Sequence, residues 1–191
     1  MPQDCTRESD FVSLFNLLWY RDYPVALGSI ELAGRADWTT HIATTVRQVA
    51  GLLGIFSRFE SGGRTDAQLV MANRKVWANL EWEWEEPRRA SVGELAKLAA
   101  ATHSCEASVF IGYSDVKNHS ANIEAIQAAW AGQSKPLIVI LISFKGLSTR
   151  YFDRLQTYRF VNDTMTLLRE QPALPWCVPN TRWEAMGDQS E

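Results

Sequence analysis

Cysteine is scarce in this chain of 191 residues, and its three cysteines lie far apart. Cys5, Cys105 and Cys177 form no Cys-x-x-Cys pair, which argues against a zinc ribbon. An odd number of cysteines also fits a reducing compartment better than a secreted protein. Metal binding through thiolates is therefore not expected.

The sequence also lacks histidines at a functional spacing and phosphate-binding loops. The three histidines have neither metal-ligand nor catalytic-triad spacing, so we interpret them as structural or exposed: His41, His103 and His119. No glycine-rich loop matches a Walker or dinucleotide-binding fingerprint. The candidates for chemistry are therefore carboxylates.

The chain also lacks excess positive charge and long apolar runs. A net charge of -3 argues against a protein that coats nucleic acid in bulk, although a nuclease needs only one positive face. The longest apolar stretch, residues 136–144, is far too short to span a bilayer. The first residues lack the basic start and apolar run of a signal peptide. We therefore expect a cytoplasmic protein with no membrane partner.

The composition that remains is that of an ordinary globular domain. The chain is 46% hydrophobic and 21% charged, and its length suits a single domain over residues 1–191. Apolar residues at helical spacing predict a helix over residues 39–53. From Gly54 the spacing becomes alternating, which predicts a three-stranded antiparallel meander over residues 54–85.

Two apolar strands follow the meander, at residues 107–113 and 136–144, with a helix over residues 119–132 between them. Strand, helix and strand in this order predict a right-handed parallel crossover. The fold class is therefore α/β, with a mixed β-sheet (antiparallel meander plus parallel strands) flanked by helices. An N-terminal helical extension precedes this core, and a C-terminal extension is predicted to be helical over residues 151–170 and then proline-rich.

Glutamates alternate with apolar residues on the third meander strand, in Leu80-Glu81-Trp82-Glu83-Trp84-Glu85. Strand side chains alternate between faces, so Glu81 and Glu83 share one face, with Cα atoms roughly 6.6 Å apart. A tight turn at Asn73-Arg74 pairs the preceding strand antiparallel, which brings Asp66 near both. One Asp and two Glu make an all-oxygen site suited to Mg²⁺ or Mn²⁺. The alternative is an edge strand with a solvated acidic face.

The order of elements over residues 39–144 resembles the core of the restriction-endonuclease-like, PD-(D/E)XK, nuclease superfamily. Members of that family hold metal with an Asp on the second meander strand and a (D/E)-x-K on the third. Asp66 matches the Asp, and Glu81-Trp82-Glu83 matches the (D/E)-x-K, with Glu in the Lys position as in some type II restriction enzymes. No Pro precedes Asp66. The resemblance implies Mg²⁺- or Mn²⁺-dependent phosphodiester hydrolysis, with Asp66 and Glu81 as ligands and Glu83 orienting water or holding a second ion.

The resemblance extends to the helix after the third strand, where some members of the superfamily carry catalytic groups. Glu94 and Lys97 lie one turn apart there and are further catalytic candidates. The alternative is that Glu94 completes a capping box with Ser91 and forms an ordinary ion pair with Lys97. The resemblance also implies that the partner is nucleic acid, with DNA preferred over RNA. It implies a homodimer if both strands of a duplex are cleaved.

Several arginines are candidates for phosphate contacts. Arg88 and Arg89 follow the third strand, where solvated loop arginines are the alternative. If residues 151–170 are helical, Arg150, Arg154 and Arg159 form a basic strip. An amphipathic surface helix explains the same strip equally well.

Two other functions fit parts of the sequence. A non-catalytic relative of the same fold, serving as a nucleic-acid-binding or assembly module, explains the missing Lys and predicts no metal at Asp66. A small α/β signalling or interaction domain is suggested by Ser108–Asp115, which loosely resembles the first strand of TIR-like domains. That strand normally opens its domain, whereas here it lies in the middle of the chain.

Overall fold

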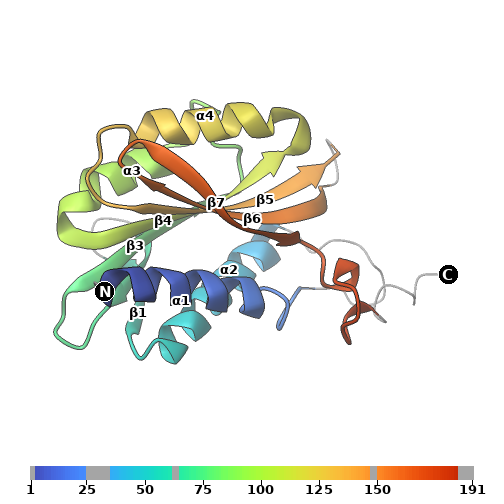
Figure 1. The fold of residues 1–191 in the computed structure, drawn as a ribbon, viewed down its shortest axis with the longest axis horizontal. Helices are drawn as coiled ribbons and strands as arrows, with labels where there is room; N and C mark the ends of the chain where they lie inside the picture. Colours follow the sequence, from blue (N-terminus) through green and yellow to red (C-terminus); the bar gives the residue numbers. More distant parts are fainter. Residues whose placement is uncertain (1–2, 25–34, 62–64, 147–149, 185–191) are drawn as a thin grey trace.

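Seven strands form one mixed β-sheet, and their order across the sheet follows their order in the chain. The computed structural model describes residues 3–24, 35–61, 65–146 and 150–184. The first three strands form an antiparallel meander. The third, fourth and fifth strands pair in parallel, and the fifth, sixth and seventh pair antiparallel (Figure 1). The strands are β1 (Phe56–Ser61), β2 (Thr65–Val70), β3 (Val76–Glu83), β4 (Cys105–Asp115), β5 (Leu137–Lys145), β6 (Tyr151–Val161) and β7 (Thr164–Pro172).

In the described residues, four α-helices cover the two faces of the sheet in pairs. Helices α1 and α2 lie on one face, and the crossover helices α3 and α4 lie on the other (Figure 1). Within the described part of the chain, no helix combines the length and hydropathy needed to cross a membrane. The helices are α1 (Gln3–Leu18), α2 (Arg35–Leu52), α3 (Glu94–Ala101) and α4 (His119–Trp130), with short 3-10 helices at Thr102–Ser104, Val116–Asn118 and Pro175–Cys177.

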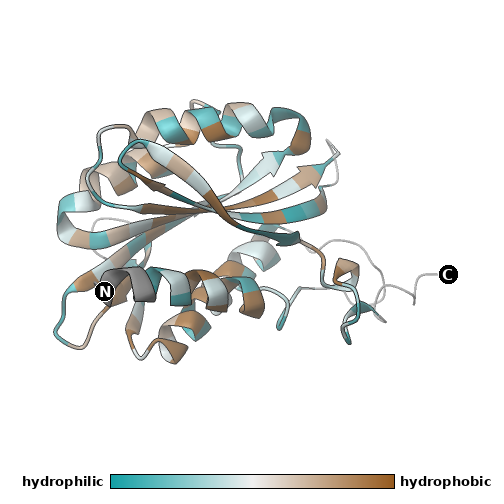
Figure 2. Ribbon diagram, in the orientation of Figure 1, coloured by the Kyte–Doolittle hydropathy of each residue, from teal (hydrophilic) through white to brown (hydrophobic). Residues whose placement is uncertain are grey.

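Strand β5, next to the middle strand of the sheet, is apolar on both faces and belongs to two cores. Ile138 and Ile140 pack in the core under α1 and α2, whereas Leu137 and Val139 pack in the core under α3 and α4. A strand of this composition is stable only where helices cover both faces. Figure 2 shows the central strands as predominantly hydrophobic. Each such fully buried side chain contributes about 1.5–3 kcal/mol.

The α/β class and the elements predicted between residues 39 and 144 are confirmed, with small shifts at their ends. The helix predicted over residues 151–170 is wrong, because this segment forms the antiparallel hairpin β6–β7. Asn162 and Asp163 form its turn with φ of 49° and 58°, the conformation of a type I′ turn. Pairing of β6 with β5 buries Phe152 and Leu155, a tertiary contact that overrides the local helical spacing.

A buried histidine packs among aromatic rings between α1 and α2. The His41 ring lies 4.7 Å from Trp19, 5.8 Å from Tyr23 and 5.9 Å from Trp38, measured between ring centroids. Burial lowers the pKa of His41 from 6.5 to about 4. The folded protein therefore holds a neutral imidazole over a pH range in which the unfolded chain binds a proton.

We expect stability to fall on acidification because of His41. Its folded-state pKa lies below its unfolded-state value, so its contribution is present above about pH 6.5 and is lost as the pH falls toward 4. Urea unfolding should show a loss of about 2 kcal/mol from this residue between pH 7 and pH 5. The variant His41→Phe should lose that part of the pH dependence, whereas His103→Gln, at an exposed position, should keep it. Identical pH profiles for wild type and His41→Phe would contradict the assignment.

Candidate active site

The pairing of β2 with β3 places Asp66 opposite Glu81. Ala67 pairs with Leu80 in this antiparallel ladder, so the next residues along, Asp66 and Glu81, are cross-strand neighbours on the face that α3 covers. Glu81 is fully buried, and Asp66 is partly buried. Two of the carboxylates predicted from the sequence are therefore brought together.

The two carboxylates differ in their hydrogen bonds. Asp66 Oδ2 accepts the backbone N–H of Trp82 at 2.8 Å. Neither carboxylate oxygen of Glu81 has a hydrogen-bond partner within the described residues. Burial raises the pKa of both carboxyl groups, and the charge of Asp66 raises the pKa of Glu81 further. The hydrogen bond from the Trp82 N–H acts to lower the pKa of Asp66. An oxygen-rich, poorly satisfied carboxylate pair of this kind is suited to a hard cation.

Helix α3 adds a cation and a third carboxylate to this pair. Lys97 Nζ lies 3.0 Å from Glu94 Oε1 and 3.8 Å from Glu81 Oε2. Its bond to Glu94 is the main cause that raises the pKa of Lys97, so the side chain is an ammonium at neutral pH. The capping box predicted with Ser91 is wrong: Gly93 is the N-cap residue, and no side chain caps α3. Glu94 instead lines the pocket beside Asp66.

Glu83 lies further along β3 and makes different contacts. Its Oε1 accepts the backbone N–H of Glu85 at 3.0 Å and lies 3.2 Å from Arg35 Nη2. In the ranges that the structure describes, no group of three or more Asp, Glu, His or Cys residues is arranged to hold one ion. The metal roles predicted for Asp66, Glu81 and Glu83 therefore all stay predictions.

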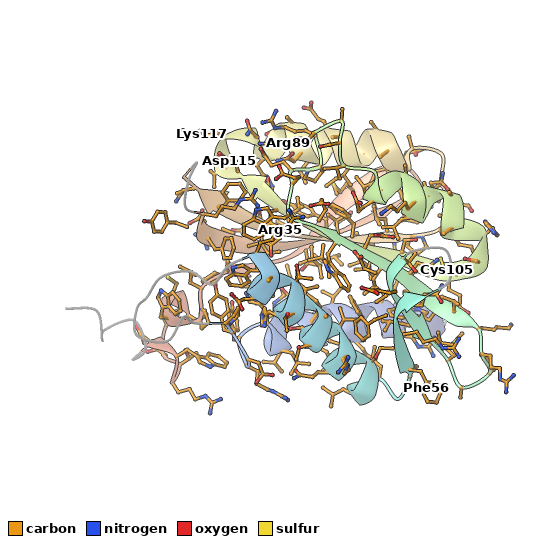
Figure 3. The ribbon with its side chains drawn as sticks, turned by 180° about the vertical axis from the view of Figure 1, so that it is seen from behind. Arg35, Phe56, Arg89, Cys105, Asp115 and Lys117 are labelled. Carbon is orange, nitrogen blue, oxygen red and sulfur yellow. The ribbon has the colours of Figure 1, made fainter. Side chains whose placement is uncertain are left out.

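A pocket of about 240 Å³ opens beside these carboxylates. It extends to α2, since Arg35, the first residue of that helix, lines it. Figure 3 labels Arg35 at the start of α2. Glu81 lies beneath the exposed surface, whereas Asp66 and Glu94 reach the pocket wall. The wall consists of Arg35, Thr39, Ile42, Asp66, Trp82, Glu83, Trp84, Glu94 and Tyr113.

A buried glutamate that the sequence did not single out fixes the carboxyl ends of the parallel strands. Glu86 accepts hydrogen bonds from the Asn122 side chain at 2.8 Å, from the Asn118 and Arg88 side chains, and from the backbone N–H of Asp115. Burial acts to raise the pKa of Glu86, but these donors outweigh it and hold the pKa below its ordinary value. One of the two candidate phosphate-binding arginines, Arg88, is thereby tied to Glu86.

The same network continues through a histidine. The Asn122 side chain donates to Ser114 Oγ at 2.9 Å, which lies 3.0 Å from His119 Nδ1. His119 Nε2 lies 2.9 Å from the Tyr158 hydroxyl. Ser114 and Asn122 are completely buried, so this chain of hydrogen bonds is structural and supports the interpretation of His119 as a structural residue.

The basic strip predicted for residues 150–159 does not form, because the segment is a strand. Arg159 forms a 2.6 Å ion pair with Glu8 of α1. Arg150 instead stacks on Trp84 at the end of β3, 4.1 Å from the ring centroid. Figure 3 shows other basic residues, Arg89 and Lys117, on the side of the molecule away from Cys105, the first residue of β4.

No family model matches the chain, and no curated protein matches it either. Among solved structures, it is similar to the YaeQ protein from Pseudomonas syringae, at 9% identity and a TM-score of 0.30, with 61% of this chain and 66% of that chain covered. It is also similar to the YaeQ protein from Xanthomonas axonopodis pv. citri, at 10% identity and a TM-score of 0.27, with 66% of this chain and 76% of that chain covered. These similarities are distant, and the function has to be inferred from the residues of this chain.

Proposed function

We propose that this protein is a metal-dependent nuclease of the restriction-endonuclease-like kind, which hydrolyses phosphodiester bonds of nucleic acid, in the first place DNA. The observation that carries the proposal is the buried pair of Asp66 and Glu81 with Lys97 beside it. Metal-assisted phosphodiester hydrolysis requires oxygen ligands for the ion and positive charge near the phosphate. Asp66 on β2 and Glu81 on β3 match the first requirement, and Lys97 on α3 matches the second.

The carboxylate pair fits Mg²⁺ or Mn²⁺. Both oxygens of Glu81 lack a hydrogen-bond partner among the described residues, and Asp66 uses one oxygen for a backbone N–H. Mg²⁺ is commonly held by one or two carboxylates, with water and substrate phosphate oxygens completing its shell. Asp66 and Glu81 would hold the ion, which when bound would activate a water and neutralise charge on the phosphate.

Lys97 supplies the positive charge that Glu83 cannot. The sequence has Glu at the Lys position of the (D/E)-x-K motif, but the Lys97 ammonium reaches the Glu81 carboxylate from α3. The ion pair with Glu94 holds Nζ in this position. Lys97 therefore acts on the negative charge that develops on the phosphate and the attacking oxygen, and Glu94 is the residue that positions it.

A non-catalytic module of the same fold is the second candidate. It is favoured by the complete burial of Glu81 and by the contact of Glu83 with Arg35, which leaves two metal-ligand carboxylates together instead of three. The signalling-domain alternative gains no support, since the segment Ser108–Asp115 is part of the middle strand of the sheet.

Titration calorimetry with Mn²⁺ tests the proposed metal site. Wild type should bind the ion, and Asp66→Asn should weaken binding strongly because it removes a ligand that reaches the pocket. Glu83→Ala should still bind at least one ion, because the Glu83 carboxylate contacts Arg35. A plasmid-nicking assay on the same variants gives the activity readout. No Mn²⁺ binding by wild type, or cleavage independent of divalent ions, would reject the nuclease and favour the non-catalytic module.

A further inference from the structure

One residue that lines the pocket has a buried hydroxyl group that lacks a partner among the described residues. Tyr113, on β4, is 2% exposed and lines the pocket, yet its hydroxyl has no hydrogen-bond partner among the described residues. Burying a hydroxyl without a partner is unfavourable, and such groups in folded proteins call for an explanation. A ligand that accepts a hydrogen bond in the pocket would supply one.

An arginine is fixed beside this tyrosine by aromatic rings. The Arg150 guanidinium carbon lies 4.1 Å from the Trp84 ring centroid, 4.4 Å from that of Phe144 and 5.6 Å from that of Tyr113. One of its N–H groups donates to the backbone oxygen of Trp84. Stacking and this single bond orient the guanidinium and leave further N–H donors on it.

Arg150 differs from its neighbours in its charge balance. Other arginines at this end of the sheet are each paired with a glutamate within 4 Å: Arg35 with Glu83, Arg88 with Glu86 and Arg89 with Glu85. No carboxylate lies within 4 Å of Arg150 in the described ranges. Its positive charge is therefore not neutralised by an ion pair.

Arg35 brings a guanidinium to the wall of the pocket itself. It is the first residue of α2, its side chain is 62% exposed, and it lines the pocket together with Tyr113. Burial raises the pKa of the Tyr113 hydroxyl, and the charges of Arg150 and Arg35 act in the opposite direction, which supports their proximity to it. The hydroxyl thus remains a neutral donor close to the guanidinium of Arg150 and to that of Arg35, which also contacts Glu83.

We propose that Tyr113, Arg35 and Arg150 form a subsite for a phosphate group of the nucleic acid strand, adjacent to the phosphodiester at Asp66 and Glu81. This subsite rests on the proposed function for its substrate class. Three donors with two positive charges match the oxygens of a phosphate, and guanidinium groups bind phosphate through paired N–H bonds. Trp82 in the same wall adds aromatic surface for the sugar and base.

The test compares a tyrosine of the predicted subsite with a buried tyrosine outside it. Tyr113→Phe removes the hydroxyl from the pocket, and Tyr23→Phe removes another buried hydroxyl that lacks a described partner but is not part of the pocket wall. Binding of a short labelled single-stranded DNA is measured by fluorescence anisotropy in EDTA, so that neither metal nor cleavage contributes. Tyr113→Phe should weaken binding by about tenfold or more, the range for a hydrogen bond to a charged group. Tyr23→Phe should bind as wild type, and neither variant should unfold more easily.

The outcomes separate the subsite from the nuclease. Weaker binding by Tyr113→Phe and by Arg150→Gln, with Tyr23→Phe unchanged, supports the subsite whether or not wild type cleaves DNA. Equal affinity of Tyr113→Phe and wild type, or no DNA binding by either, overturns the subsite even if Mn²⁺-dependent cleavage is observed. DNA binding that depends on Tyr113 without cleavage under any divalent ion retains the subsite and rejects the nuclease.

Discussion

Replacing Glu81 by glutamine should abolish cleavage and at the same time stabilise the metal-free protein. Glu81 is fully buried, its oxygens have no hydrogen-bond partner among the described residues, and Asp66 is its cross-strand neighbour. Its folded-state pKa is raised above 4.5, so the folded protein loses stability as the pH rises from the unfolded-state value toward neutrality. Glutamine keeps the shape of the side chain and, unlike glutamate, needs no proton uptake on folding. The gain should be roughly 1–3 kcal/mol at pH 7, the range for an unsatisfied buried group.

Urea unfolding in EDTA at pH 5 and pH 7 measures this effect. Wild type should be less stable than Glu81→Gln at pH 7. The difference should shrink at pH 5, because the glutamate of the unfolded chain is then close to its ordinary pKa of 4.5 and its protonation on folding costs less free energy. Glu124→Gln, on the exposed side of α4, is a control for the loss of one negative charge. Addition of Mn²⁺ should stabilise wild type and not Glu81→Gln, because only a folded state that binds the ion gains from it. A Glu81→Gln protein that is less stable and still cleaves DNA would contradict both parts.

Removal of the Lys97 ammonium should produce the other large effect. Lys97→Met should reduce cleavage by roughly 10²–10³-fold, the usual loss when one preorganised charge or donor at a developing oxyanion is removed. Mn²⁺ binding should remain, because Lys97 is not a ligand and its charge opposes that of the ion. The Glu94 contact keeps Lys97 protonated, so its titration should not limit the rate near neutral pH.

Matched variants distinguish catalysis by Lys97 from general charge effects. Lys75→Met removes an exposed lysine just before β3 and should leave cleavage unchanged. Glu94→Gln should reduce cleavage less than Lys97→Met, because Lys97 loses the partner that positions it but keeps its charge. Lys97→Met activity equal to wild type, with Mn²⁺ binding intact, would remove Lys97 from the mechanism and leave the reaction to the carboxylate pair.

The proximity of Asp66 and Glu81 could be predicted from the sequence, because local signals determine it. The turn before Lys75 and the alternation in β3 specify an antiparallel pair, and Arg74 has the left-handed φ of 68° that such a turn uses. A bulge opposite Leu69 and Val70 inserts one residue into the ladder without separating the two carboxylates. The register of two paired strands can be predicted where the turn between them and the alternation of their apolar residues indicate the same pairing.

The surroundings of Glu83 and Tyr113 could not be predicted in the same way. Arg35 contacts Glu83 from α2, and Arg150 stacks on Trp84 from beyond β5, so both contacts depend on segments distant in sequence. Neither arginine lies at a regular sequence spacing from the residue that it contacts. The hairpin β6–β7 was missed for a related reason, since its helical spacing is overridden by pairing with β5. The sequence did contain a usable signal there, the turn residues Asn162 and Asp163.

The order of the strands in the sheet also bears on how the chain folds. Every strand pairs with strands that precede or follow it directly in sequence, so no strand has to insert between two that are already joined. The entropy lost in closing the loop between each pair of neighbouring strands therefore stays small. Two hairpin-like units, β1–β3 and β5–β7, can form from local contacts, and the parallel pairings of β4 then join them. The carboxylate pair lies within the first of these units, so its geometry is set by residues close together in the chain.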